Sequence, residues 1–155
     1  FGVIGADFDE NGRSTGEYTP KMSYYALQNL CSVFCEDYEI TDIHAEGLIY
    51  ASKLILKDDY DFEKTYHFGV RKPNGSSALV YWIPNHLLTE TIETTVSLRI
   101  KKETVPGKVR LADMLTGDIY SIPESILSDG DDGYLYFKNL PATDIPMLLT
   151  FGNFY

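Results

Sequence analysis

The last third of the chain, residues 109–155, alternates short apolar runs with turn residues, and this pattern constrains the fold most. Gly117 follows the first run and can adopt the positive φ that a tight hairpin loop needs. Two more runs, 134–137 and 147–151, are apolar and aromatic, and Pro141 bounds the first of them. Four strands of this kind cannot bury both faces alone, so the preceding chain must supply a second sheet.

The preceding chain contains further strand patterns. The dipeptide Asn74-Gly75 lies between alternating runs at 66–71 and 78–83, which is the strongest hairpin signal in the chain. Residues 94–101 alternate apolar and polar side chains and predict another strand.

Two weaker strand patterns, at residues 43–50 and 52–56, complete the set. Short strands at this spacing with no helices between them indicate an antiparallel sandwich. The expected fold is therefore mainly β: an antiparallel β-sandwich of about eight strands, preceded by one amphipathic α-helix.

The helix is predicted over residues 20–36. Thr19 suits the N-cap and Pro20 suits the first helical position. One apolar stripe recurs at steps of three and four residues: Ala26, Leu27, Leu30, Val33 and Phe34. Ahead of the helix, residues 1–7 indicate a short buried strand, and a polar loop follows it. We expect two parts, residues 1–37 and the sandwich at 38–155.

Composition excludes several classes of partner. The chain has 155 residues, of which 44% are hydrophobic and 14% aromatic, as is typical of a packed globule. Its formal net charge of −10 disfavours nucleic acid and anionic membrane surfaces, which require clustered Lys and Arg. The sequence contains neither a signal-peptide pattern nor an apolar run long enough to span a membrane.

Three stretches carry a resemblance to a known family. Residues 17–30 contain a Pro-Lys-x-x-Tyr-x-Ala-Leu pattern, and the hairpin at 68–82 ends in Trp82. The third stretch is 109–117, followed by 144–149. Together they resemble the carboxyl-terminal region of clan A (β/α)8-barrel glycoside hydrolases, in which a small β-sandwich follows the catalytic barrel.

The resemblance implies that residues 1–7 are the last barrel strand and residues 20–36 the helix after it. The chain begins at Phe1 rather than Met, as expected of a segment of a longer polypeptide. The implied function is that of a non-catalytic domain that stabilises or packs against the catalytic barrel of the same polypeptide. None of the residues matches the acid/base or nucleophile carboxylates of those enzymes, so we expect no catalytic residue and no cofactor.

Two other functions remain open. An autonomous carbohydrate-binding module would stack a sugar ring on Trp82, although large aromatic side chains are more often buried by packing. An enzyme would use acidic residues such as Asp7, Asp9 and Glu10, which otherwise form a polar loop. The helix favours the barrel-associated domain, because its apolar stripe must be covered by the sandwich, by the barrel or by a second copy of the chain.

Other chemically reactive residues give weaker signals. The three histidines, His44, His67 and His86, are scattered and lack metal-ligand spacing, so we expect no metal site. The acidic turn at 128–133 lacks the glutamate that a calcium loop needs further on, which indicates a solvated hairpin tip. Cys31 and Cys35 are too close along a helix for a disulfide and are expected to be buried free thiols.

Overall fold

The structure is a computed structural model that describes residues 2–47, 65–84 and 92–155, and its architecture is mainly β. In chain order the elements are β1 (Ile4–Phe8), β2 (Ser14–Pro20), α1 (Met22–Val33), β3 (Glu39–Thr41), β4 (Ala45–Gly47), β5 (Tyr66–Arg71), β6 (Ser77–Trp82), β7 (Glu93–Lys101), the 3-10 helix η2 (Lys102–Thr104), β8 (Val109–Asp113), β9 (Ile119–Ser121), β10 (Leu127–Asp129), β11 (Tyr134–Thr143) and β12 (Met147–Phe151).

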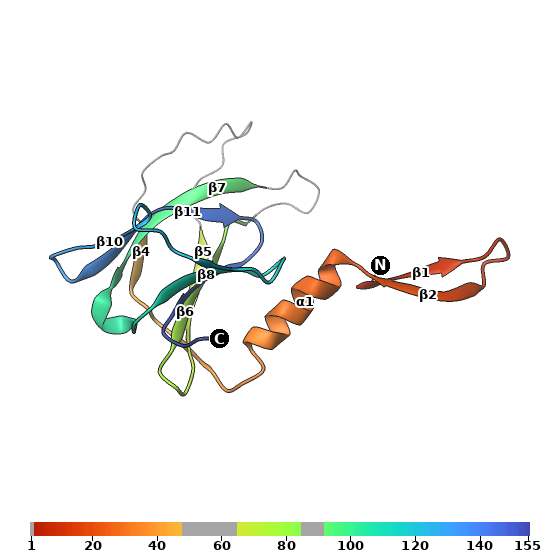
Figure 1. Cartoon of the computed structure of the whole chain (residues 1–155), viewed down its shortest axis with the longest axis horizontal. Coiled ribbons are helices and arrows are strands. Elements are labelled where there is room, and N and C mark those ends of the chain that lie inside the picture. The colour runs from red at the N-terminus through yellow and green to blue at the C-terminus, as the bar shows by residue number, and fades with distance from the viewer. Residues whose placement is uncertain (1, 48–64, 85–91) are drawn as a thin grey trace.

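Two antiparallel sheets form the sandwich (Figure 1). One has six strands in the order β3-β5-β6-β12-β8-β9, and the other has four in the order β10-β11-β7-β4. The predicted fold class is confirmed, including the single α-helix ahead of the sandwich, within the residues described. These residues form more strands than the roughly eight expected from the spacing of apolar runs.

The main core lies between the two sheets. Alternation along β6 directs Leu79 and Tyr81 into it, and alternation along β7 directs Leu98 and Ile100. We call this set the inner cluster; its other buried members are Ile43, Ile83, Ile92, Val105, Leu111, Phe137, Leu140, Ala142, Met147, Leu149 and Phe151. The predicted strand at 94–101 is therefore confirmed, with its apolar face turned to the core.

A second apolar layer covers the opposite face of the six-stranded sheet. We call it the outer cluster, and its buried members are Val33, Val70, Ala78, Val80, Ala112, Met114, Leu148 and Phe154. Because both faces of this sheet are covered, β6 and β12 are apolar along almost their whole length, as a strand buried on two sides requires.

Both predicted hairpins are confirmed. Strands β5 and β6 pair with Tyr66 opposite Trp82, and Gly75 has φ 82° in the turn between them. Strands β8 and β9 pair across a turn in which Gly117 has φ 81°. A side chain at Gly117 would also lie within 3 Å of Asn29, so both conformation and space require glycine there.

Pro141 does not end a strand, contrary to the prediction. It lies inside β11, opposite Thr95, beyond a β-bulge between Phe137 and Leu140. Asn139 in this bulge has φ 56°. The bulge shifts the register, so the proline is accommodated within a long strand that sequence patterns split at that point.

The strand predicted at 43–50 is confirmed in part, because β4 (Ala45–Gly47) pairs with β7 in the four-stranded sheet. The residues just before it are not extended as predicted: β3 lies in the six-stranded sheet, and a turn separates it from β4. Between them Asp42 accepts the backbone N–H of His44, which has φ 50°, and this turn carries the chain from one sheet to the other. The predicted strand at 52–56 lies outside the described residues.

The amino-terminal predictions need correction as well. Strand β1 is not buried; among the described residues it pairs with β2 alone, whose residues are all exposed, and the expected polar loop is partly replaced by β2. Pro20 is the last residue of β2, opposite Ile4, so α1 begins at Met22 rather than at Pro20. Lys21 occupies the N-cap without a side-chain hydrogen bond, so Thr19 does not cap the helix.

We call Ile4–Val33, that is β1, β2 and α1, the arm. Figure 1 shows that the β1–β2 hairpin projects away from the sandwich and that only the carboxyl-terminal end of α1 reaches it.

Candidate functional site

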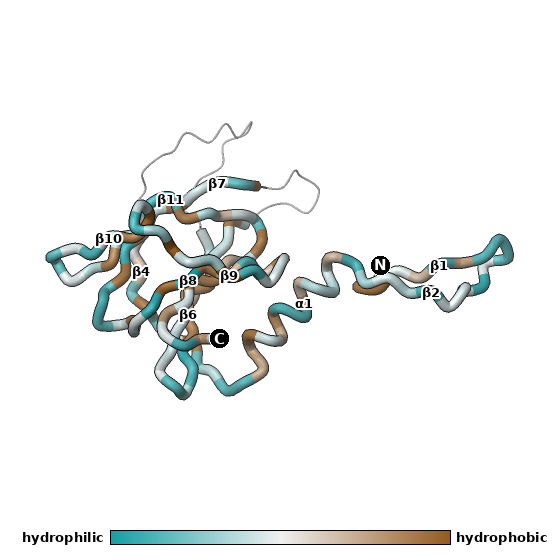
Figure 2. The backbone as a smooth tube through the Cα atoms, in the orientation of Figure 1, coloured by the Kyte–Doolittle hydropathy of each residue, from teal (hydrophilic) through white to brown (hydrophobic). Residues whose placement is uncertain are grey.

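The arm exposes large apolar side chains along its length. Figure 2 shows that hydrophobic residues, in brown, alternate with hydrophilic ones along α1 and the β1–β2 hairpin. The exposed fractions of the large apolar side chains run from 41% at Leu30 to 67% at Met22. We call this set the arm surface: Ile4, Phe8, Tyr18, Met22, Tyr25, Leu27 and Leu30. Single exposed apolar residues are ordinary, whereas several of them on one projection are typical of interaction sites.

The predicted helical stripe is covered at one end only. Val33 is buried in the outer cluster and Phe34 packs at its edge. Ala26 is partly buried, whereas Leu27 and Leu30 are exposed by 49% and 41%. The stripe thus packs on the sandwich at its carboxyl-terminal end, and none of the residues described covers the rest.

Polar contacts fix the middle of α1 against the sandwich. The Asn29 side-chain amide donates to the carbonyl oxygens of Met114 and Leu115, each at 3.3 Å. These carbonyls belong to the β8–β9 turn, so the hairpin turn and the helix hold one another in place. On the amino-terminal side of Asn29 the arm leaves the sandwich, so Asn29 marks the end of the junction between α1 and the sandwich.

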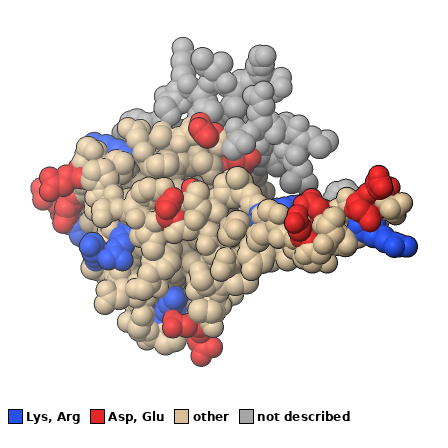
Figure 3. Space-filling view, turned by 45° about the vertical axis from the view of Figure 1, so that its right-hand side comes forward, with Lys and Arg blue, Asp and Glu red and all other residues tan. Residues whose placement is uncertain are grey.

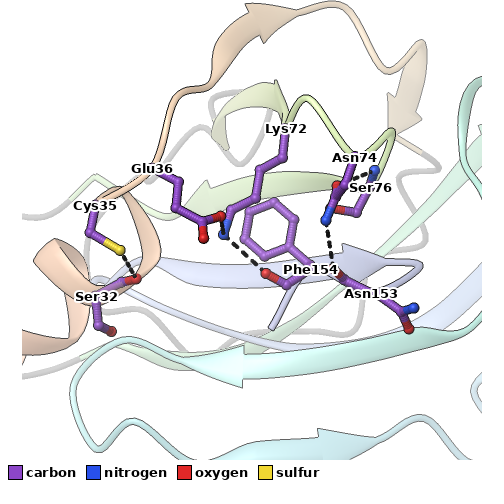
Figure 4. Close-up of polar contacts among 8 residues, drawn as sticks. All are labelled: Ser32, Cys35, Glu36, Lys72, Asn74, Ser76, Asn153 and Phe154. Carbon is purple, nitrogen blue, oxygen red and sulfur yellow. Dashed lines mark hydrogen bonds and ion pairs between the residues drawn. The ribbon is translucent and has the colours of Figure 1, made fainter.

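Lys72 stabilises the other side of the junction (Figure 4). This lysine is only 8% exposed, and its Nζ donates to the Phe154 carbonyl oxygen at 3.1 Å and to Glu36 Oε2 at 3.4 Å. Nζ also lies 4.7 Å from the centroid of the Phe154 ring. A buried ammonium group needs such partners, because desolvation otherwise disfavours it strongly.

The neighbouring turn holds the same carboxyl-terminal segment. The Asn74 side-chain amide donates to the Asn153 carbonyl oxygen at 3.2 Å, and the Asn74 Oδ1 accepts from Ser76 (Figure 4). The turn between β5 and β6 therefore binds residues 152–155, which we call the tail, at two points. The role of Lys72 could not be predicted from the sequence, because a lysine beside a turn is ordinarily exposed to water.

Trp82 lies at the end of β6 on the outer face of the six-stranded sheet, because alternation along the strand directs it away from Tyr81. Its ring is 5.7 Å from Tyr66, tilted by 32°, and 6.2 Å from Phe68, nearly edge-on. We call these three residues the aromatic corner. Trp82 packs at the edge of the outer cluster and stays partly exposed, and Tyr66 is 54% exposed.

The histidines do not come together. His44 Nδ1 lies 3.0 Å from Asp42, and the exposed His67 contacts the backbone of Thr65. His86 lies outside the described residues. Within the part of the chain that the structure describes, no three His, Cys, Asp or Glu residues are grouped as a metal would require.

The carboxylates of the acidic turn bind the protein's own donors. Asp129 forms an ion pair with Lys102, and Asp132 accepts a short hydrogen bond from the Tyr136 hydroxyl. This hydrogen bond lowers the pKa of Asp132 and raises that of Tyr136. The turn is thus stabilised from within, in keeping with a hairpin tip.

The acidic residues near the amino terminus serve the hairpin. Asp9 Oδ1 accepts the backbone N–H groups of Asn11 and Arg13, at 2.9 Å and 2.8 Å, and so closes the β1–β2 turn. Asp7 and Glu10 are exposed on the same projection.

The two cysteines are free, but the prediction that they are buried is wrong. Cys31 is on the exposed side of α1, and Cys35 follows the helix, where its thiol contacts the Ser32 carbonyl oxygen. Both lie near the packed end of the helix and are nevertheless exposed, because the helix turns Asn29 and Val33, and not the cysteines, toward the sandwich.

Charged side chains are unevenly placed. In the view of Figure 3, acidic and basic groups gather on the arm, at the far end of the sandwich and at its lower end, and the face between them is mostly uncharged apart from a few acidic groups. No helix among the described residues is long and apolar enough to cross a membrane. The sequence matches no family model, and no curated protein matches it.

Proposed function

We propose that this chain is a non-catalytic β-sandwich domain of a glycoside hydrolase that packs against the catalytic barrel of the same polypeptide and stabilises it. The observation that supports this proposal is the arm surface. The resemblance to the carboxyl-terminal region of clan A hydrolases implies that the last barrel strand and helix lie in the same stretch of the chain.

The arm needs a neighbour to be stable. A two-stranded hairpin is marginal in water, and β2 buries none of its residues. Within the described residues, β1 and β2 form a two-stranded sheet of their own. The outer edge of each strand can therefore pair with a strand of another domain. A partner domain that covers the hairpin and the exposed side of α1 would supply both strand pairing and apolar burial.

The experiment compares this chain with a longer polypeptide that includes the sequence encoded upstream of Phe1. We expect that sequence to encode a barrel, and we expect amide hydrogen exchange at β1, β2 and α1 to slow in the longer polypeptide. Leu27→Asp should lower its unfolding midpoint, because a charge would be buried at the interface.

Ile40→Asp is the matched control. Ile40 is 74% exposed on β3, outside the arm surface, so this variant should leave the midpoint unchanged. An upstream sequence without a barrel, or equal exchange of the arm in both polypeptides, would overturn the proposal. Concentration-dependent protection of the arm in this chain alone would point instead to a second copy as the partner.

A second candidate function is carbohydrate binding at the aromatic corner. The observation that favours it is the partly exposed pair of Tyr66 and Trp82, since a sugar ring stacks on aromatic faces and one ring alone contributes too little to offset the cost of association. Titration calorimetry with soluble polysaccharides separates the two functions.

We expect no binding of micromolar strength. Micromolar binding that is lost in Trp82→Ala and in Tyr66→Ala, with stability kept, would favour the carbohydrate-binding function. Tyr120→Ala is the control, because this tyrosine is 48% exposed on β9, at the opposite edge of the sheet from β3.

A further inference from the structure

Two segments far apart in the sequence cover the same face of the six-stranded sheet. The end of α1 contributes Val33, which is 4% exposed, and the tail contributes Phe154, which is 3% exposed. Both side chains belong to the outer cluster, which also includes Val70, Ala78 and Leu148 from the sheet below them.

Lys72 contacts both of these segments (Figure 4). Its Nζ donates to the tail at the Phe154 carbonyl oxygen, and it forms an ion pair with Glu36, three residues beyond the end of α1. Among the described residues it is the one charged side chain that is buried. Glu36 is 67% exposed, so the pair joins a buried cation to a solvent-facing carboxylate.

We infer that Lys72 couples the position of α1 to the position of the tail, so that loosening either segment loosens the other. A buried ammonium group that loses one of its two oxygen partners is left undersolvated, and it then favours conformations that admit water. Such coupling is reciprocal by thermodynamic necessity. The tail thereby helps to set the direction in which the arm leaves the sandwich.

This coupling is distinct from packing in the outer cluster. Val33 and Phe154 would stabilise one another through shared apolar neighbours even without a charge between them. Lys72→Met tests the difference, because methionine keeps an apolar stem of similar length and removes only the ammonium group. A purely packed junction would tolerate this substitution.

The measurement is the backbone ¹⁵N order parameter of the whole chain in solution. We expect Lys72→Met to lower the order parameters from the rigid value of about 0.85 to below about 0.6, both in residues 30–36 and in residues 153–155. Strands β7 and β12 should keep their order parameters. Lys102→Met is the matched control, because Lys102 contacts Gly130 and Asp129 at the far hairpin tip and should leave both segments unchanged.

Glu36→Ala is the decisive second variant, because Glu36 is exposed and removal of its carboxylate does not threaten folding. Within the described residues this carboxylate bonds to Lys72, so a fall in the order parameters of residues 153–155 would be transmitted through the lysine. Order parameters in the variant with both substitutions should match those of Lys72→Met alone.

A change confined to residues 30–36 in Glu36→Ala, or to the tail in Lys72→Met, would overturn the coupling. If Lys72→Met does not fold, the tail response to Glu36→Ala decides alone. Both measurements use this chain without any partner, so their failure would leave the proposed function untouched, and the reverse also holds.

Discussion

Ser77 is the polar side chain that the inner core accommodates least well. It is fully buried on β6, and within the described residues its hydroxyl has no hydrogen-bond partner. Because a buried unpaired hydroxyl costs about 1–3 kcal/mol, we expect Ser77→Ala to raise the free energy of unfolding by roughly 1 kcal/mol. Urea denaturation measures the change.

The neighbouring Ser76 is the control for this prediction. Its hydroxyl donates to Asn74 Oδ1 at 2.6 Å and its backbone N–H donates to the same atom, so Ser76→Ala should destabilise the turn. A fall in stability on Ser77→Ala that equals or exceeds the fall on Ser76→Ala would mean that the Ser77 hydroxyl is bonded after all.

Tyr81 joins the two sheets. Its ring lies in the inner cluster and its hydroxyl donates to the Pro141 carbonyl oxygen on β11 at 2.7 Å. Tyr81→Phe removes this bond and should lower the free energy of unfolding by about 1–2 kcal/mol, because the carbonyl group loses its partner.

Tyr81 also makes the free energy of unfolding depend on pH. Burial raises the pKa of Tyr81 well above its ordinary value of 10.0 and raises that of Tyr155 to about 12. The folded state therefore holds these protons more tightly than the unfolded state, so their contribution is complete below pH 10 and is lost as pH rises above it. The alkaline decline in stability should be shallower in Tyr81→Phe; an identical decline in both proteins would contradict the assignment.

At the scale of residues, alternation correctly predicted which face of a strand a side chain occupies. The partners of polar side chains could not be predicted. The period of two placed Leu79 and Tyr81 on one face of β6 and Trp82 on the other, because a buried strand leaves no other choice. The role of Lys72 could not be read in the same way, since its partners Glu36 and Phe154 are distant in the sequence.

At the scale of elements, the arm combines a packed end with an exposed remainder, and substitutions should separate the two. Leu27→Gln with Leu30→Gln should change the free energy of unfolding of this chain by less than about 0.5 kcal/mol, because both side chains are exposed. Val33→Ala should lower it by roughly 2 kcal/mol, because Val33 is buried in the outer cluster.

Thermal or urea denaturation of the three proteins checks this contrast, and binding of a fluorescent apolar dye gives a second reading. The double glutamine variant should bind less dye than the parent chain, since it removes exposed apolar surface. Equal destabilisation by the exposed and buried substitutions would mean that the stripe is covered in solution.

Elements with a strong local signal were predicted well. The hairpin at Asn74-Gly75 and the turn at Gly117 formed where expected, because the turn residues themselves favour the turn conformation. The start of α1 was misplaced because Thr19-Pro20 fits a helix start as well as a strand end, and only the pairing of Pro20 with Ile4 decides between them. Likewise, β11 includes Pro141 because of a β-bulge that no local sequence pattern predicted.

At the scale of the whole molecule, the mainly β fold with one helix followed from patterning, because the spacing of apolar runs limits the architectures available. The candidate site was anticipated in outline, as an amphipathic helix whose stripe needs cover. Within the part of the chain that the structure describes, most of the arm surface is uncovered, and this tertiary property cannot be predicted from sequence periodicity. The division between residues 1–37 and 38–155 stays a prediction.

We expect this chain alone to hydrolyse no glycoside. The usual mechanism requires two carboxylates on either side of the scissile bond, and the acidic residues singled out by sequence serve turns instead, as Asp9 and Asp132 do. Incubation with a panel of aryl glycosides measures turnover. Activity that a single Asp or Glu substitution abolishes would contradict the expectation.

The projecting arm also bears on the lifetime of a polypeptide in which the proposed barrel does not cover it. Proteases bind extended segments as added strands, and β2 offers such a segment with every residue exposed. Arg13 in the hairpin turn and Lys21 at its base are accessible to a trypsin-like enzyme. A polypeptide whose proposed barrel had not packed against the arm would then be cleaved first at the arm, whereas one with the barrel packed would persist, so the arm would let a cell's degradation machinery distinguish folded molecules from incompletely folded ones.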